Sequence, residues 1–244
     1  MNPSFVVPRH VSDQASTISY NLPDGYELEV LYAPKEHQHG SWVSLAEAPG
    51  GIMYASDQWG DLYQFPIPAI GETLDTTQVQ PLPLDIGNAQ GLLWAFNSLY
   101  VSVNERWVQN DAAMQHGVGA YRLQDSDQDG QLDQIEPLIR LEGEGEHGPH
   151  SLILSPDQQH IYFIAGNMTK VPEEVASNSR QPRHWATDNL LKPYLDARGH
   201  AHNVQPPGGW VARFEPDGSN WELYCSGFRN PYDFGFNPDH LVTR

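Results

Sequence analysis

Residues 146–167 read EHGPHSLILSPDQQHIYFIAGN, and this stretch carries the repeating pattern on which the fold rests. A short apolar run (HSLIL) is followed by a Ser-Pro-Asp turn and then by a second apolar run (IYFIA). Short apolar runs bounded by turn residues are typical of β-strands. His150 stands at the start of the first run, where a histidine can be a structural residue, a metal ligand or a catalytic base.

The same pattern recurs along the chain. YELEVLYA, IMYASDQ and LYQFPI form a first cycle, and GLLWAF, LYVSVN and GAYRLQ form a second. The third contains the stretch above and GWVARFEP, and a fourth starts with WELYCSG and YDFGFN. Tyr54, Tyr100 and Tyr162 hold matching places in their cycles. Repeats of about four short strands joined by Asp, Asn, Gly and Pro turns predict the blades of a β-propeller.

We therefore predict an all-β chain, a β-propeller of which the sequence covers about three to four blades. Residues 1–20 are expected to form a lead-in and residues 21–244 a partial propeller domain, with an insertion at about 167–207. A propeller needs closure to hide its strand edges, so an intact sequence is expected to continue beyond Arg244. A β-sandwich is the alternative arrangement.

Composition narrows the class of partner. The 244 residues carry a formal net charge of -18 at pH 7, so nucleic acid and anionic membranes would be repelled. No apolar run of about 18 residues occurs, which predicts no membrane span. The single cysteine, Cys225, rules out an intramolecular disulfide, and the absence of a C-x-x-C-H motif rules out haem attachment within this chain. No signal peptide is visible at the start.

The stretch DSDQDGQLDQIE (residues 125–136) matches the calcium-loop template D-x-D-x-D-G-x5-E. Alternating carboxylates can converge on one hard cation if the chain turns sharply, which Gly130 permits. Leu132 stands where such calcium loops usually have an apolar residue that anchors the loop. The flanks read as strands, so we expect a structural Ca²⁺ loop without EF-hand helices; a solvated acidic turn is the alternative. The predicted ligands are Asp125, Asp127, Asp129, Asp133 and Glu136.

Polar residues precede apolar runs at corresponding turns of the cycles: Gln90, His150, and the pair Arg229 and Asn230. In a propeller such positions ring the central axis, so residues distant in sequence meet at one mouth. His150 is a candidate general base there, because the ordinary pKa of histidine lies near neutrality. Arg229 could pair with a carboxylate or phosphate. Each residue alone could also be a turn-stabilising hydrogen-bonding group.

The other histidines give weaker signals. His147 could support His150 or cap the turn, and the cap is the favoured interpretation. The H-x-H pairs at 37–39 and 200–202 would each point two rings to one side of a strand, but no third metal ligand accompanies them. Loop hydrogen bonding is therefore the favoured interpretation of both pairs. No G-x-S-x-G nucleophile elbow and no phosphate-binding glycine loop occurs.

Five segments carry a resemblance to a known family: SDQWGDLY, AQGLLWAFNSLYVSVN, GEGEHGPHSLILSPD, LDARGHAHNVQPPGGWVARFEPDG and SGFRNPYDFGFNPD. Together they resemble the sorbosone dehydrogenase-like propellers of the PVC-type haem-binding (membrane-bound dehydrogenase) group. The resemblance covers roughly residues 20–244. A more distant resemblance, resting on fewer residues, connects the chain to the soluble quinoprotein glucose dehydrogenases.

That resemblance implies a six-bladed propeller, periplasmic or extracellular, often with a cytochrome c domain or partner as electron acceptor. It implies pyrroloquinoline quinone (PQQ) over the central mouth and oxidation of a hydroxyl or hydrated aldehyde of a small-molecule sugar or alcohol. By that pattern His150 is the catalytic base, Arg229 and Asn230 hold the quinone, and Gln90 orients the substrate.

Two other functions fit the same pattern of residues. One is a non-catalytic propeller that binds a carbohydrate or a protein partner at its polar mouth. The other is a hydrolase or lactonase propeller with calcium at its axis. The hydrolase would need carboxylates at the mouths, where Gln90, His150 and Arg229 stand instead.

Overall fold

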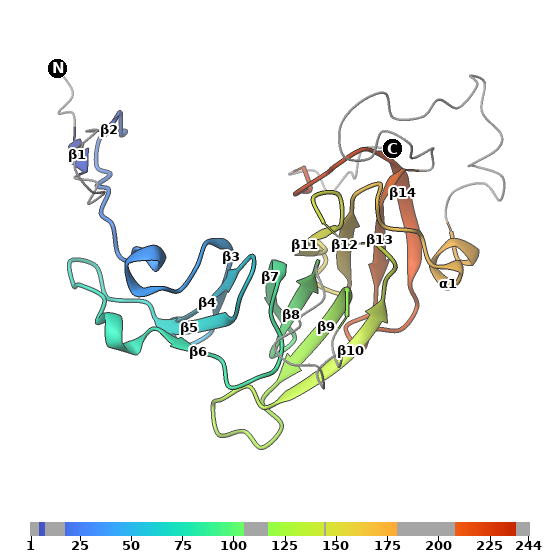
Figure 1. The fold of residues 1–244 in the computed structure, drawn as a ribbon, viewed down its shortest axis with the longest axis horizontal. Coiled ribbons are helices and arrows are strands. Elements are labelled where there is room, and N and C mark those ends of the chain that lie inside the picture. Colours follow the sequence, from blue (N-terminus) through green and yellow to red (C-terminus); the bar gives the residue numbers. More distant parts are fainter. Residues whose placement is uncertain (1–4, 8–17, 105–116, 144, 180–207, 238–244) are drawn as a thin grey trace.

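The computed structural model describes residues 5–7, 18–104, 117–143, 145–179 and 208–237. Within these ranges the chain is all-β, and its main body consists of three four-stranded antiparallel sheets lying side by side (Figure 1). In each sheet every strand pairs with its neighbour in sequence. Such four-stranded meanders are consistent with the predicted blades of a partial propeller.

The first sheet contains β3 (Trp42–Ala48), β4 (Ile52–Asp57), β5 (Leu62–Pro66) and β6 (Gln80–Pro81). The second contains β7 (Ala89–Ala95), β8 (Ser98–Val103), β9 (Gly119–Gln124) and β10 (Gln134–Arg140). The third contains β11 (Pro149–Leu154), β12 (Ile161–Ala165), β13 (Gly209–Phe214) and β14 (Glu222–Phe228). Outside them lie the hairpin of β1 (Phe5–Val7) and β2 (Ile18–Tyr20), the 3-10 helices η1 (Pro34–His37) and η2 (Thr76–Gln78), and the short helix α1 (Glu173–Ser177).

The hairpin between β7 and β8 shows how the predicted turns close the sheets. Ala95 pairs with Ser98 across a two-residue loop, and both loop residues have a positive φ, 50° at Phe96 and 52° at Asn97. This is the geometry of a type I′ turn, whose twist matches that of the two strands. Asparagine tolerates the left-handed region, so Asn97 fixes the position of the turn.

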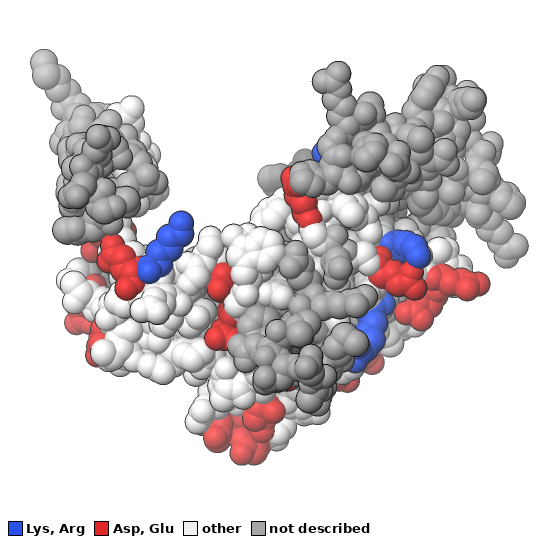
Figure 2. Space-filling model, viewed as in Figure 1, with Lys and Arg blue, Asp and Glu red and all other residues white. Residues whose placement is uncertain are grey.

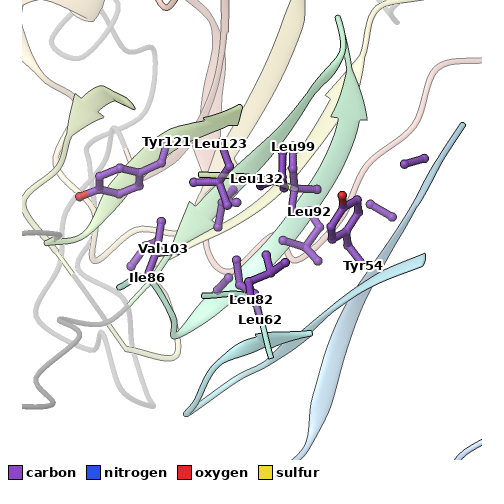
Figure 3. Close-up of a cluster of buried hydrophobic side chains, with 14 residues drawn as sticks. Tyr54, Leu62, Leu82, Ile86, Leu92, Leu99, Val103, Tyr121, Leu123 and Leu132 are labelled. Atoms are coloured by element: carbon purple, nitrogen blue, oxygen red, sulfur yellow. The ribbon is translucent and has the colours of Figure 1, made fainter. Parts of the chain in front are cut away.

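The sheets pack against one another through two apolar cores. The core between the first and second sheets includes Tyr54 and Leu62 on one side and Leu92 and Leu99 on the other (Figure 3). Leu132, from the loop between β9 and β10, is buried in the same core, as the anchor prediction requires. The core between the second and third sheets is more aromatic. It includes Tyr100, Phe163, Trp210, Phe214 and Trp221.

The prediction for the first cycle was wrong for one of its strands. Residues 26–33, predicted as a strand from their alternation, form none, and the first strand of this sheet is β3 instead. Val30 is 63% and Leu31 41% exposed, so their apolar side chains have no packed face to join. Alternation produces a strand only where a partner strand and a buried face are available.

The boundary of the predicted fourth cycle was also wrong. WELYCSG forms β14, which pairs with β13 and completes the third sheet. YDFGFN forms no strand, although Phe234 and Phe236 pack against Tyr162 and Val211 on the open face of that sheet. Most of the predicted insertion, residues 180–207 with the second H-x-H pair, lies outside the described residues, as does most of the predicted lead-in at residues 1–20.

Candidate functional site

The first strands of the three sheets share one irregularity near their beginnings. β3, β7 and β11 each start with a normal pair and then contain one extra residue relative to the partner strand. The extra residue is Val43 in β3 and Gln90 in β7, and it is one of His150 and Ser151 in β11. Such β-bulges redirect side chains and are frequent beside active sites. The structure thus places Gln90 and His150 at equivalent positions of neighbouring sheets.

The strands that carry these two residues touch. A Cβ atom added to Gly91 would lie 2.3 Å from the carbonyl oxygen of His150 and 3.0 Å from the Cα atom of Ser151. Only glycine permits this approach of two backbones. Because Gln90 immediately precedes Gly91, the predicted substrate-side glutamine and the predicted base lie on adjoining backbone segments.

His150 is buried, with 4% of its surface exposed. Its Nε2 atom lies 3.1 Å from the backbone carbonyl oxygen of Glu146 and 3.1 Å from the side-chain oxygen of Asn230. The ring of Tyr232 lies against the imidazole, with 4.9 Å between the ring centroids. Two residues of the segment after β14 therefore hold a histidine of the β11 strand, although they lie about eighty positions apart in sequence.

Burial lowers the pKa of His150 below its ordinary value of 6.5, because a buried imidazolium loses its hydration. The hydrogen bonds to Asn230 and Glu146 act in the opposite direction, and the neighbouring His147 adds a small lowering effect. The other ring nitrogen, Nδ1, is buried and has no hydrogen-bond partner among the described residues. Burial thus favours the neutral imidazole, the form that can accept a proton.

The two residues predicted to hold a quinone differ in their surroundings. Asn230 is partly buried and its side-chain oxygen faces His150. Arg229 is exposed, and its backbone carbonyl oxygen accepts a hydrogen bond of 2.9 Å from the backbone N–H of Asn167. The backbone of Arg229 is therefore fixed to the turn that follows β12, while the residue itself lies at the surface next to Asn230.

His147 was predicted to cap a turn, and the structure gives it a more specific environment. Its side chain is 1% exposed, and its Nδ1 atom lies 2.6 Å from the side-chain oxygen of Asn167. An amide oxygen can only accept, so Nδ1 carries the proton in this contact. The buried site therefore contains two histidines, each oriented by an asparagine oxygen. The sequence signal for this pair is weak, since His147 and Asn167 lie in different strand ends twenty residues apart.

The acidic loop brings three of its five predicted metal ligands together. Carboxylate oxygens of Asp125, Asp127 and Asp129 all lie within 4.8 Å of one another. The loop turns at Gly130, whose φ is +91°, and its N–H donates to Asp125 at 2.8 Å. Figure 2 shows carboxylates gathered over this projecting loop. Three converging carboxylates form a donor set suited to a hard cation such as Ca²⁺.

The other two predicted ligands use their carboxylates elsewhere. Asp133 accepts hydrogen bonds from the backbone N–H of Ser126, at 2.8 Å, and from its hydroxyl, at 2.7 Å. Glu136 lies in β10 directly opposite Arg122 of β9 and forms an ion pair with it. Asp133 therefore closes the loop, and Glu136 links two strands.

The first H-x-H pair belongs to an aromatic cluster. The hydroxyl of Tyr32 lies 2.6 Å from Nδ1 of His39, and His39 stacks on Tyr63 with centroids 4.5 Å apart. His37 stacks on Tyr32 with centroids 4.6 Å apart. The contact of His39 with Tyr32 agrees with the predicted loop hydrogen bonding, and His37 makes a stacking contact that was not predicted.

This chain is distantly similar to solved protein structures. Neither the protein-family models nor the curated proteins match this sequence. Among solved structures, a protein of Thermus thermophilus described as a candidate oxidoreductase (glucose dehydrogenase) is similar over 82% of this chain, with 18% sequence identity and a TM-score of 0.46. The match covers 54% of that protein, so the chain spans about half its length. None of the helices described here is long and apolar enough to cross a membrane.

Proposed function

We propose that the chain forms part of a six-bladed β-propeller of a quinoprotein-like, sorbosone-type dehydrogenase. The reaction is oxidation of a hydroxyl or hydrated aldehyde of a sugar or alcohol. The observation that carries this proposal is the buried His150 held by Asn230, on a strand that adjoins the strand of Gln90. A neutral imidazole in a desolvated position is an effective proton acceptor.

Each predicted residue has a distinct role in this proposal. His150 removes the proton of the substrate hydroxyl as the carbon is oxidised. Gln90, at the equivalent bulge of the neighbouring sheet, orients the substrate by hydrogen bonding through its amide. Arg229, exposed beside Asn230, provides a guanidinium for an anionic group.

The residues at this position fit an anionic quinone such as PQQ. The Arg229 guanidinium can pair with a carboxylate, and the amide N–H groups of Asn230 can donate while its oxygen faces His150. When bound there, PQQ would accept the hydride from the substrate carbon. A cytochrome c domain or partner would then receive the electrons, and the protein would be periplasmic or extracellular.

Calcium has a structural role in this proposal. Asp125, Asp127 and Asp129 would hold Ca²⁺ at the tip of the loop between β9 and β10, and Leu132 anchors that loop in the core between two sheets. Bound Ca²⁺ would neutralise three mutually repelling carboxylates and thereby stabilise the loop. Residues 21–244 as a whole would be the partial propeller domain.

The test is to titrate the full-length protein with PQQ and Ca²⁺ and to measure dye reduction across a panel of sugars and alcohols. We expect saturable PQQ binding and quinone-dependent dye reduction. A well-folded protein that binds no PQQ would contradict the enzymatic proposal and would favour a propeller that only binds a carbohydrate or protein partner.

A further inference from the structure

The contacts of His150 define which of its ring nitrogens carries the proton. The backbone carbonyl oxygen of Glu146 lies 3.1 Å from Nε2 and has only lone pairs to offer. A hydrogen bond at this distance therefore requires a proton on Nε2. The side-chain oxygen of Asn230, also 3.1 Å away, is a second acceptor for the same N–H group.

The proton on Nε2 determines the state of the other ring nitrogen, Nδ1. A neutral imidazole has one N–H group, so a proton on Nε2 leaves a lone pair on Nδ1. This Nδ1 atom is buried and has no hydrogen-bond partner among the described residues. The basic atom of the ring is therefore a desolvated lone pair.

We propose that Asn230 is a positioning residue that, together with the carbonyl of Glu146, holds His150 as the Nε2–H tautomer, so that Nδ1 is the atom that accepts the substrate proton. The proposal rests on the proposed function for the identity of the reaction. The assignment of the tautomer rests only on the contacts of His150 itself.

The arrangement also stabilises the product of proton transfer. When the O–H bond of the substrate breaks, its proton forms a new N–H bond at Nδ1, and the two electrons leave with the hydride to the quinone named above. The ring becomes an imidazolium, and its Nε2–H group then donates to two oxygens as a charged donor. Hydrogen bonds from a charged donor are about twice as strong as neutral ones. The acceptors therefore stabilise the charged state more than the neutral one.

This role differs from the one that the sequence suggested for Asn230. As a direct quinone ligand, Asn230 would affect quinone affinity first and the histidine little. As a positioning residue, it supports the Nε2–H tautomer that the carbonyl of Glu146 requires and affects the basicity of His150, whether or not a quinone is bound. The two roles therefore predict different results in the absence of any cofactor.

The experiment is ¹⁵N NMR of the histidine rings in the full-length protein without added quinone, with the His150 signals assigned by their loss in His150→Gln. We expect wild-type His150 to be the Nε2–H tautomer. Asn230→Asp should keep this tautomer, and so should Asn230→Leu, because the carbonyl of Glu146 remains as an acceptor. Asn230→Leu should instead lower the pKa of His150, because the imidazolium loses one of its two acceptors. Asn237→Asp makes the same chemical change at an exposed asparagine of the same segment and should leave the His150 signals unchanged.

The kinetic part of the test uses the same variants after loading with PQQ. Asn230→Asp places a carboxylate beside the imidazole, so the acid limb of kcat/KM should move up by about one pH unit. Asn230→Leu should lower kcat about ten- to a hundredfold, because it removes a hydrogen bond to a charged group.

Three results would overturn the inference. The first is a wild-type His150 with its proton on Nδ1, and the second is an Asn230→Leu variant that is folded and has the wild-type pKa at His150. The third is an Asn230→Asp variant in which the acid limb of kcat/KM lies at the same pH as in wild type. A protein with the Nε2–H tautomer but no dye reduction on any substrate would contradict the proposed function and leave the tautomer assignment intact.

Discussion

Gly91 lies directly against the backbone of His150: a methyl group added to Gly91 would come within 2.3 Å of the carbonyl oxygen of His150. Backbone atoms cannot move aside as the end of a flexible side chain can. Ser44 of β3 connects the first sheet to the second, since its hydroxyl oxygen accepts a 3.0 Å hydrogen bond from the backbone N–H of Leu92 in β7. The position of His150 thus depends on how closely β7 approaches β11.

Gly91→Ala should separate these two strands and displace His150. We expect a loss of about 1–3 kcal/mol in the free energy of unfolding, the usual cost of overpacking, and a decrease in any activity that depends on His150. Urea denaturation followed by tryptophan fluorescence measures the first effect. Gly235→Ala is the matched control, because an added methyl there meets no atom within 4 Å. Equal stability of the two variants would show that the junction tolerates a side chain.

His150→Gln should separate an enzyme from a binding module. Glutamine preserves hydrogen bonding but cannot act as a base near neutral pH, so kcat should fall about 10²–10⁴-fold, while ligand affinity should change little. Dye-reduction kinetics and calorimetry on the same preparation give both quantities. His160→Gln is the control, since His160 is a partly buried histidine that contacts Glu215 at 3.4 Å, away from the proposed site. Unchanged turnover in His150→Gln would eliminate His150 as the base.

The pH dependence follows from the lowered pKa of His150. Burial favours the neutral ring, so the acid limb of kcat/KM should lie below the ordinary histidine value of 6.5. The unfolded chain binds this proton more readily than the folded chain. The contribution of neutral His150 to stability is therefore complete above pH 6.5 and is lost as the pH falls through the lower folded-state pKa.

Chemical denaturation across this pH range, compared between wild type and His150→Gln, measures that contribution. The variant should lose less stability than the wild type on acidification below pH 6.5. Parallel pH profiles for the two proteins would contradict the burial of a neutral ring.

Calcium should bind at the loop between β9 and β10. Asp127→Asn and Asp129→Asn should each weaken Ca²⁺ binding, since each removes one of three converging carboxylates. In wild type, Ca²⁺ at a hundred times its Kd should add about 2.7 kcal/mol of stability, visible as a rise in Tm. Asp217→Asn, in another exposed turn closed by Ser219, is the control. If Ca²⁺ changes neither the Tm nor the heat of titration in wild type, the loop is a solvated acidic turn.

Much of the fold follows from local patterns in the sequence. β8, β12 and the turns before them were predicted because apolar runs and turn residues determine them locally. β3 was missed because its side chains include Glu47 and small residues, and its role depends on pairing with β4. The assignment of β14 depends on its pairing with β13, which no local pattern specifies.

The candidate site was predictable in its positions but not in its contacts. The equivalence of Gln90 and His150 could be read from matching turns, and the bulges account for it physically. The hydrogen bonds of His147 with Asn167 and of His150 with Asn230 join residues that only tertiary packing brings together. The last predicted ligand of the acidic loop, Glu136, also makes a contact that its spacing does not indicate. The spacing of Glu136 fits the calcium template, but its position across from Arg122 in the sheet gives it a different partner.

The recurrent bulge also bears on how such a chain could change its chemistry during evolution. The extra residue at this point lies outside the pairing register, so a change of its side chain removes no pair of the strand register. The extra residue is Val43 in β3, Gln90 in β7 and either His150 or Ser151 in β11, so its side chain differs from sheet to sheet. New substrate specificities could therefore arise by single substitutions at these bulge positions, without a compensating change in the strand pairing around them.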